Sequence, residues 1–124
     1  MELIYKNEVY NAVGICMEIQ KILGYGFSEI VYKDAMEREF VDHGIQYIRE
    51  DELLVYYKGH ILKHKFNADF TIFNDIIMVA KTSDEGITDE AISQTLNYLK
   101  ASHCKVDLIV NFGKTKFEYK RLVM

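Results

Sequence analysis

Asp69 lies in the middle of an alternating apolar segment, and Lys81 ends a second, nearly continuous apolar run. If both segments are strands, side-chain alternation places Asp69 on one face and both Ala68 and Phe70 on the other. A carboxylate in such a strand is costly to bury unless a positive charge or a metal ion compensates it. The residues therefore predict either a structural Asp69–Lys81 ion pair or a carboxylate that holds a metal.

Gln94 and Tyr98 form a second pair of polar side chains, four residues apart in a segment of helical periodicity. One helical turn separates them, so their polar ends project the same way. The simpler interpretation is an exposed polar face with a half-buried tyrosine. The alternative is a pair that acts together on a substrate.

The scaffold that must position these residues follows from hydrophobic periodicity. A strand, a helix and a further strand in succession indicate a right-handed crossover between parallel strands, whereas the earlier hairpins are antiparallel. We expect one α/β domain, with a mixed sheet flanked by helices and the order ααβββαββ. The helices are expected over 9–23, 28–42 and 88–102, and the strands over 45–57, 65–73, 76–81, 106–112 and 117–123.

Length and composition narrow the class of protein. A chain of 124 residues with 49% apolar side chains fits one folded domain and excludes disorder. No apolar run reaches the roughly 18 residues of a membrane span. Cys16 and Cys104 lie in apolar segments without a metal-binding spacing, which indicates free thiols in a reducing compartment. We therefore expect a cytoplasmic protein that has no structural zinc and does not bind membranes.

The net charge of −4 is unevenly distributed along the chain. Residues 1–57 carry −6 and residues 58–124 carry +2. A surface for nucleic acid would therefore belong to the second half. The simpler interpretation is a solvated hairpin and an edge strand protected by lysines. The candidate nucleic-acid-binding residues are Lys58, Lys63 and Lys65 near the hairpin and Lys114 and Lys116 near the C-terminus.

The aromatic side chains of the expected strands suggest a third function. The expected strands and the turns beside them contain more aromatic side chains than a small sheet must bury, and exposed aromatics favour interfaces. A non-catalytic module that dimerises or binds a protein partner is therefore a further alternative. The side chains concerned are Tyr56, Tyr57, Phe70, Phe73, Phe112 and Phe117.

The stretch Gly26-Phe27-Ser28-Glu29-Ile30-Val31-Tyr32 resembles the signature of the GxxExxY protein family, a branch of the PD-(D/E)XK nuclease-like superfamily. The resemblance covers nearly all of residues 1–124 and implies a restriction-endonuclease-like core of order αβββαβ, in agreement with the elements above. Its signature residues are Gly26, Glu29 and Tyr32. Its other segments are Val55-Tyr56-Tyr57-Lys58-Gly59, Ala68-Asp69-Phe70, Gln94 to Lys100, Asn111-Phe112-Gly113 and Glu118 to Arg121.

The resemblance also implies roles for particular residues. Asp69 and Lys81 match the Asp and the Lys of the nuclease motif, in which carboxylates hold Mg²⁺ or Mn²⁺ and the metal activates water. Gln94 and Tyr98 match a QxxxY pair that helps to position substrate. Glu29 is a candidate extra metal-binding carboxylate beside Asp69.

Val79 departs from the family pattern, because it stands where the Glu of the Glu-x-Lys motif is expected. A valine has no oxygen to offer a metal, and loss of a metal-binding carboxylate should cost on the order of 100-fold or more in affinity or activity. We therefore expect an incomplete metal site, impaired catalysis, retained nucleic-acid or protein binding, and an Asp69–Lys81 contact without an ion. The alternative is an active Mg-dependent DNA or RNA nuclease in which Glu29 supplies the missing carboxylate.

Overall fold

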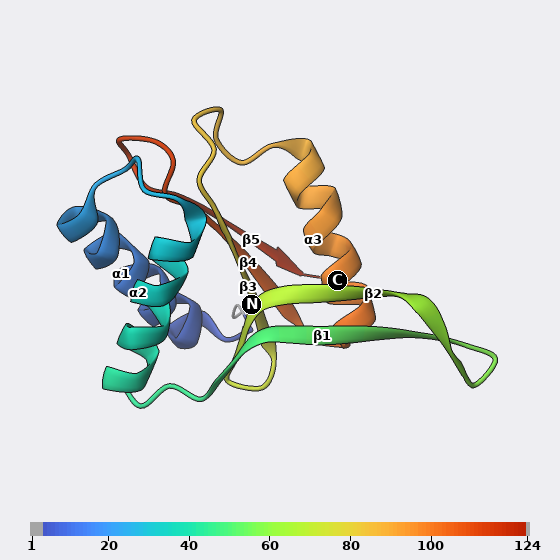
Figure 1. The fold of residues 1–124 in the computed structure, drawn as a ribbon. Coiled ribbons are helices and arrows are strands. Elements are labelled where there is room, and N and C mark those ends of the chain that lie inside the picture. The colour runs from blue at the N-terminus through green and yellow to red at the C-terminus, as the bar shows by residue number, and fades with distance from the viewer. Residues whose placement is uncertain (1–3, 124) are drawn as a thin grey trace.

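The computed structural model describes residues 4–123 as a five-stranded sheet with three helices (Figure 1). The predicted order ααβββαββ is confirmed. The elements are α1 (Lys6–Leu23), α2 (Glu29–Asp42), β1 (Tyr47–Tyr57), β2 (His60–Ile72), β3 (Ile76–Lys81), α3 (Asp89–Ser102), β4 (Val106–Asn111) and β5 (Glu118–Val123).

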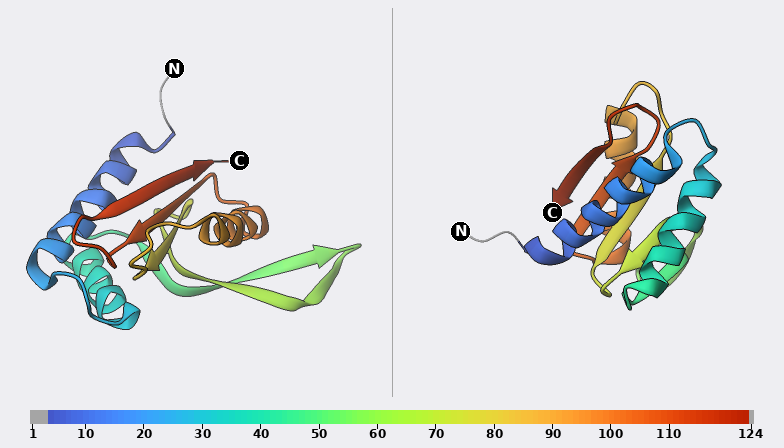
Figure 2. Two further views of the ribbon diagram at one scale, coloured as in Figure 1. Left: turned by 90° about the horizontal axis from the view of Figure 1, so that it is seen from above. Right: turned by 90° about the vertical axis from the view of Figure 1, so that its left-hand side faces the viewer.

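The strands form one mixed sheet in the order β1-β2-β3-β4-β5. β3 and β4 are parallel and the other neighbours are antiparallel, because α3 carries the chain back across the sheet between β3 and β4. α1 and α2 cover one face and α3 covers the other (Figure 2). The ends of β1 and β2 project beyond the rest of the sheet as a two-stranded hairpin (Figure 1).

Apolar side chains are buried in two clusters, one on each face of the sheet. The larger lies under α1 and α2 and includes Phe70. The smaller lies under α3 and contains Leu53, Ala68, Ile77 and Val79. Both β2 and β3 contribute side chains to each cluster.

The alternation of side chains along β2 breaks at Asp69. Ala68 packs under α3 whereas Phe70 packs under α1 and α2, so the prediction that they share a face is wrong. Glu50 lies opposite this point in β1 and has a φ of 54°, in the left-handed region. Such a distortion twists both strands locally and re-aims their side chains. Asp69 therefore lies where β2 changes the face that it buries.

Several helix and strand ends differ from the predicted ones by a few residues, and the largest difference is at the start of β2. β2 begins at His60 rather than near residue 65, because residues 60–65 pair with β1 although their side chains are exposed. Thr88 caps α3 as expected, its Oγ1 accepting the N–H of Ala91 at 3.1 Å. Ser28 precedes α2, but within the described chain its hydroxyl makes no capping bond.

Cys16 is buried and Cys104 is half-buried, and both are free thiols. Burial raises the pKa of each. None of the helices within residues 4–123 has the length and apolar character needed to cross a membrane.

Asp107 is a buried carboxylate in β4. Its neighbours Val106 and Leu108 face α1 and α2, so alternation turns Asp107 toward α3. Among the residues that the structure describes, neither carboxylate oxygen has a hydrogen-bonding partner. Burial raises the pKa of Asp107 to about 8; the nearby N–H of Leu108 opposes the rise but does not meet hydrogen-bond geometry.

Gly113 lies where the chain leaves β4 and passes the backbone that follows β3. A Cβ at this position would lie 2.4 Å from the backbone N of Ser83 and from the carbonyl carbon of Thr82. The side chain of Asn111 ties the same segments together, its Oδ1 accepting the N–H of Ser83 at 2.9 Å and that of Gly113 at 3.1 Å. A larger residue at 113 must therefore displace backbone.

Gly113→Ala is expected to lower the free energy of unfolding by roughly 2–3 kcal/mol, because the added methyl overpacks this contact. Urea denaturation measures the change. Gly14→Ala is the matched control, since within the described structure its Cβ would meet nothing within 4 Å and its helix would gain up to about 1 kcal/mol. Equal stability of the two variants would contradict the close approach.

Candidate functional site

Asp69 lies where β2 separates from β3. The last pair of the β2–β3 ladder is Phe70–Met78. Beyond it, Asp69 Oδ2 accepts the N–H of Ala80 at 2.8 Å, and Oδ1 accepts from Lys33 Nζ at 3.1 Å. The carboxylate therefore satisfies a buried N–H of β3 that has left the ladder, as buried backbone groups require.

The predicted Asp69–Lys81 ion pair is wrong. Lys81 Nζ donates to Gln94 Oε1 at 3.1 Å, and the cation that faces Asp69 is Lys33 of α2. Lys81 shares the face of β3 that α3 covers, whereas Asp69 Oδ1 turns toward α2. The change of face at Asp69 explains why the two charges do not meet.

Lys33 of α2 and Glu50 of β1 are the residues of this site that sequence reasoning missed. Only 8% of the Lys33 side chain is exposed, and its ammonium group donates to the carboxylates of both Glu50 and Asp69. Burial alone would lower the pKa of Lys33, but the hydrogen bonds with these two carboxylates outweigh it and the pKa is raised. The one signal in the sequence is its position four residues after Glu29, on the same face of a helix.

Glu29 begins α2 and is half-buried. Burial raises the pKa of Glu29, the negative charge of Asp69 raises it further, and the positive charges of Lys81 and Lys33 oppose the rise. The structure thus places this carboxylate within electrostatic range of Asp69. The resulting cluster joins Glu29, Lys33 and Glu50 to Asp69.

Gln94 and Tyr98 lie on α3, on the side that faces the sheet. Gln94 is exposed, and its Oε1 accepts a hydrogen bond from Lys81. Tyr98 is partly buried, and its ring lies edge-on to Phe66 at a centroid distance of 5.7 Å. Burial, and then the charge of Asp69, raises the pKa of Tyr98. One turn of α3 therefore directs both side chains toward the strands that carry Asp69 and Lys81.

The signature residues Gly26 and Tyr32 have structural roles. Gly26 has a φ of 111°, which favours glycine. The hydroxyl of the buried Tyr32 donates to the carbonyl of Gly24 at 2.6 Å, and its ring stacks on Phe112 at 4.5 Å. These contacts fix the start of α2 against the end of α1 and β4, and so position Glu29.

The side chains present do not fit a divalent metal ion. Val79 is only 2% exposed and packs with Ala68 and Ile77, so this position offers no oxygen. Both oxygens of Asp69 are bonded to N–H donors, and the ammonium of Lys33 already supplies a positive charge there. Mg²⁺ requires several oxygen ligands. Across residues 4–123, no three His, Cys, Asp or Glu side chains are grouped as a metal site.

The candidate nucleic-acid-binding lysines lie in two places. Lys58, Lys63 and Lys65 lie on the exposed end of the β1–β2 hairpin. Lys114 and Lys116 lie between β4 and β5, at the opposite end of the sheet (Figures 1 and 2). Lys65 and Lys114 each have a carboxylate partner, Glu52 and Glu118 respectively. The two groups therefore cannot act as one patch.

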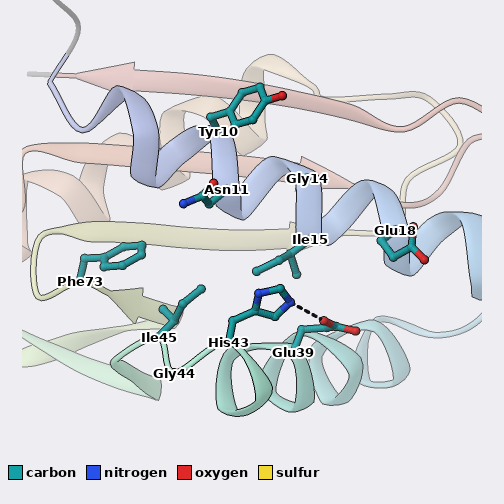
Figure 3. Close-up of a pocket in the computed structure, with 10 residues that line it drawn as sticks. All are labelled: Tyr10, Asn11, Gly14, Ile15, Glu18, Glu39, His43, Gly44, Ile45 and Phe73. Atoms are coloured by element: carbon teal, nitrogen blue, oxygen red, sulfur yellow. Dashed lines mark hydrogen bonds and ion pairs between the residues drawn. The ribbon is translucent and has the colours of Figure 1, made fainter.

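A cleft of about 290 Å³ opens beside the site, between Lys81 at the end of β3 and Gln94 on α3. A larger cleft of about 510 Å³ lies between α1 and α2, where His43 and Glu39 pair at 3.1 Å (Figure 3). The larger cleft is on the opposite face of the sheet from α3. Of the two, the smaller cleft is the one that adjoins the candidate site.

A mixed five-stranded sheet between helices, with a carboxylate where the second and third strands separate, defines a nuclease-like α/β domain. A family model of the PD-(D/E)XK nuclease superfamily matches residues 6–122, and the chain belongs to that superfamily. Nucleases of this superfamily usually use Mg²⁺ or Mn²⁺.

Among solved structures, the crystal structure of SSO0001 is similar, with a TM-score of 0.60 at 18% sequence identity. The match covers 96% of this chain and 59% of that one, so this chain spans about three-fifths of its length. At this identity the likeness establishes the restriction-endonuclease-like fold alone. A search of curated proteins returned no match.

Proposed function

We propose that this chain is a member of the GxxExxY branch that binds nucleic acid through its nuclease-like fold without hydrolysing it. The branch is supported by Gly26, Glu29 and Tyr32, which form its signature. The main support for the loss of hydrolysis is the position of Lys33. Its ammonium group is bonded to Asp69, at the place where a nuclease would bind its metal.

In this proposal Asp69 and the residue at the missing carboxylate have roles other than metal binding. Asp69 accepts the N–H of Ala80, which the β2–β3 pairing leaves free, and Lys33 neutralises the charge of Asp69. Val79 fills the apolar cluster under α3, where a carboxylate would be costly. An active nuclease that uses Glu29 as the extra ligand is not favoured, because the ammonium of Lys33 is already bonded to Asp69 and Val79 offers no oxygen beside it.

Nucleic-acid binding survives in this proposal because phosphate contacts come from basic groups and not from a metal. The exposed lysines of the hairpin and of the β4–β5 loop are the candidates. The free thiols Cys16 and Cys104 support a reducing compartment, and we propose the cytoplasm.

With Mg²⁺ or Mn²⁺, the purified protein is expected to cleave single- and double-stranded DNA and RNA no faster than its Asp69→Asn variant does. The asparagine keeps an oxygen for the N–H of Ala80 and removes the charge, so it is a matched control. Gel analysis of labelled substrates measures the rate. Metal-dependent cleavage that disappears in Asp69→Asn would overturn the proposal.

A further inference from the structure

The end of the β1–β2 hairpin extends beyond the rest of the sheet as a two-stranded ribbon (Figures 1 and 2). Every residue from Tyr56 to Lys65 is exposed. Tyr56 is 61% exposed and its neighbour Tyr57 is 59% exposed, although they point to opposite faces. Both faces of this ribbon are therefore open to a partner.

The ribbon is basic in an acidic chain. Residues 53–68 contain the three lysines Lys58, Lys63 and Lys65 and no Arg, Asp or Glu, whereas the net charge of the whole chain is −4. Glu52, just before this segment, is paired with Lys65 at 3.7 Å. The segment itself supplies no carboxylate for Lys58 or Lys63. The ribbon is therefore suited to an anionic partner.

One face of the ribbon carries Lys63 and Lys65. The register pairs Tyr56 with Ile61 and Leu54 with Lys65, and residues that are paired across an antiparallel ribbon share a face. Lys63 lies between Ile61 and Lys65, two residues from each, so alternation places it on the same face. This face therefore presents Tyr56 together with two lysines.

The opposite face carries Lys58. Tyr57 pairs with His60, one residue along each strand from Tyr56 and Ile61, so this pair lies on the opposite face. Lys58 is in the turn, and its Nζ lies over the ring of Tyr57 at 5.5 Å from the ring centroid. The ribbon thus presents at least one lysine on each of its two faces.

A partner that meets both faces must carry negative charge on two sides of a ribbon that is about 10 Å thick with its side chains. The major groove of B-form DNA has a phosphate backbone along each wall, is about 12 Å wide and 8.5 Å deep, and admits a two-stranded β-ribbon. The minor groove, about 6 Å wide, is too narrow. The major groove of duplex RNA is also too narrow. A single strand has one backbone, so it meets one face only.

We propose that this ribbon inserts, turn first, into the major groove of double-stranded DNA, with Lys58 and Lys63 facing the phosphates of opposite walls. Strands rise about 3.4 Å per residue, so the stretch from Tyr56 through the turn to Ile61 spans the depth of the groove. The proposal rests on the proposed function and names its class of nucleic acid and the element that binds it. Phosphate contacts carry no sequence information, so binding is expected to depend little on sequence.

The test is fluorescence anisotropy in EDTA with a labelled DNA duplex of about two helical turns, compared with an RNA duplex of the same sequence and with the single DNA strand. The DNA duplex is expected to bind most tightly. Lys58→Gln and Lys63→Gln are each expected to reduce the slope of log K against log salt by about 0.9, the value for one phosphate contact on B-form DNA. Lys21→Gln removes the same charge from an exposed position in the last turn of α1 and is the matched control.

Tightest binding of the DNA duplex, weakened in both ribbon variants and kept in Lys21→Gln, supports insertion into the groove. A reduced slope in only one of the two ribbon variants overturns it, because a ligand on one face has this effect. Equal or tighter binding of the RNA duplex or of the single strand also overturns it, and so does binding that Lys116→Gln weakens instead. These three results leave the proposed function standing.

Absence of any nucleic-acid binding overturns both the ribbon and the proposed function. If no nucleic acid binds and sedimentation shows a dimer that Ile61→Thr dissociates, the exposed ribbon is a protein interface and the DNA proposal is wrong. Thermal melts of each variant check that it is folded.

Discussion

Asp107→Asn is expected to raise the free energy of unfolding at pH 7 by at most about 4 kcal/mol, which is the cost of protonating this carboxyl on folding. In the native protein Asp107 is fully buried with both oxygens unpartnered in the described structure, and burial raises its pKa from 3.8 to about 8. At neutral pH the folded protein must hold a proton there that the unfolded chain has lost. An amide of the same shape removes this cost, because it is neutral in both states.

The pH dependence has a definite sign. Because the folded pKa of Asp107 lies above the unfolded value, its contribution to stability is fully present below about pH 4, and it is lost as the pH rises toward about 8. The native protein should therefore lose stability between about pH 4 and pH 8, and this part of the loss should be absent in Asp107→Asn.

Urea denaturation of both proteins at several pH values measures the effect. Asp84→Asn, an exposed carboxylate in the loop before α3, is the matched control and should change stability by less than about 0.5 kcal/mol. Equal stability of native protein and Asp107→Asn at pH 7, with parallel pH profiles, would show that Asp107 has a partner or reaches water.

Lys33→Met is expected to lower the free energy of unfolding by roughly 3 kcal/mol, because it removes the cation from a largely buried ion pair and leaves the charge of Asp69 uncompensated. The side chain of Asp69 is 17% exposed, whereas that of Glu50 is 52% exposed and can turn to water. The loss should therefore come mainly from Asp69. Arg38→Met, which breaks the exposed Arg38–Asp42 pair, is the control and should cost less than about 1 kcal/mol.

A double-mutant cycle tests whether the loss of stability in Lys33→Met comes from the Lys33–Asp69 ion pair. In Lys33→Met/Asp69→Asn the uncompensated charge is gone, so the double variant should be more stable than Lys33→Met alone. Mn²⁺ should raise the melting temperature of Lys33→Met but not that of the native protein. Only in the variant are the carboxylates of Glu50 and Asp69 free of the Lys33 ammonium. Equal stabilisation of both by Mn²⁺ would contradict the role given to Lys33.

The local elements of the fold were predictable because their causes are local. Helical and strand periodicities mark α1 and β3, and the threonine cap marks the start of α3, since each depends on neighbouring residues. The exposed part of β2 was missed because residues 60–65 have no buried face to produce a pattern. The resemblance also indicated the superfamily, which the match over residues 6–122 establishes.

The sequence by itself determined the order of elements, the class of fold, and the absence of a carboxylate at Val79. Only the tertiary structure decided the partner of Asp69. Strand alternation pointed Asp69 toward Lys81, but the left-handed Glu50 changes the face of β2 at that point, and α2 brings Lys33 to it from a distant part of the chain. A side chain's partner depends on strand twist and on how helices pack, and neither is encoded in the spacing of nearby residues.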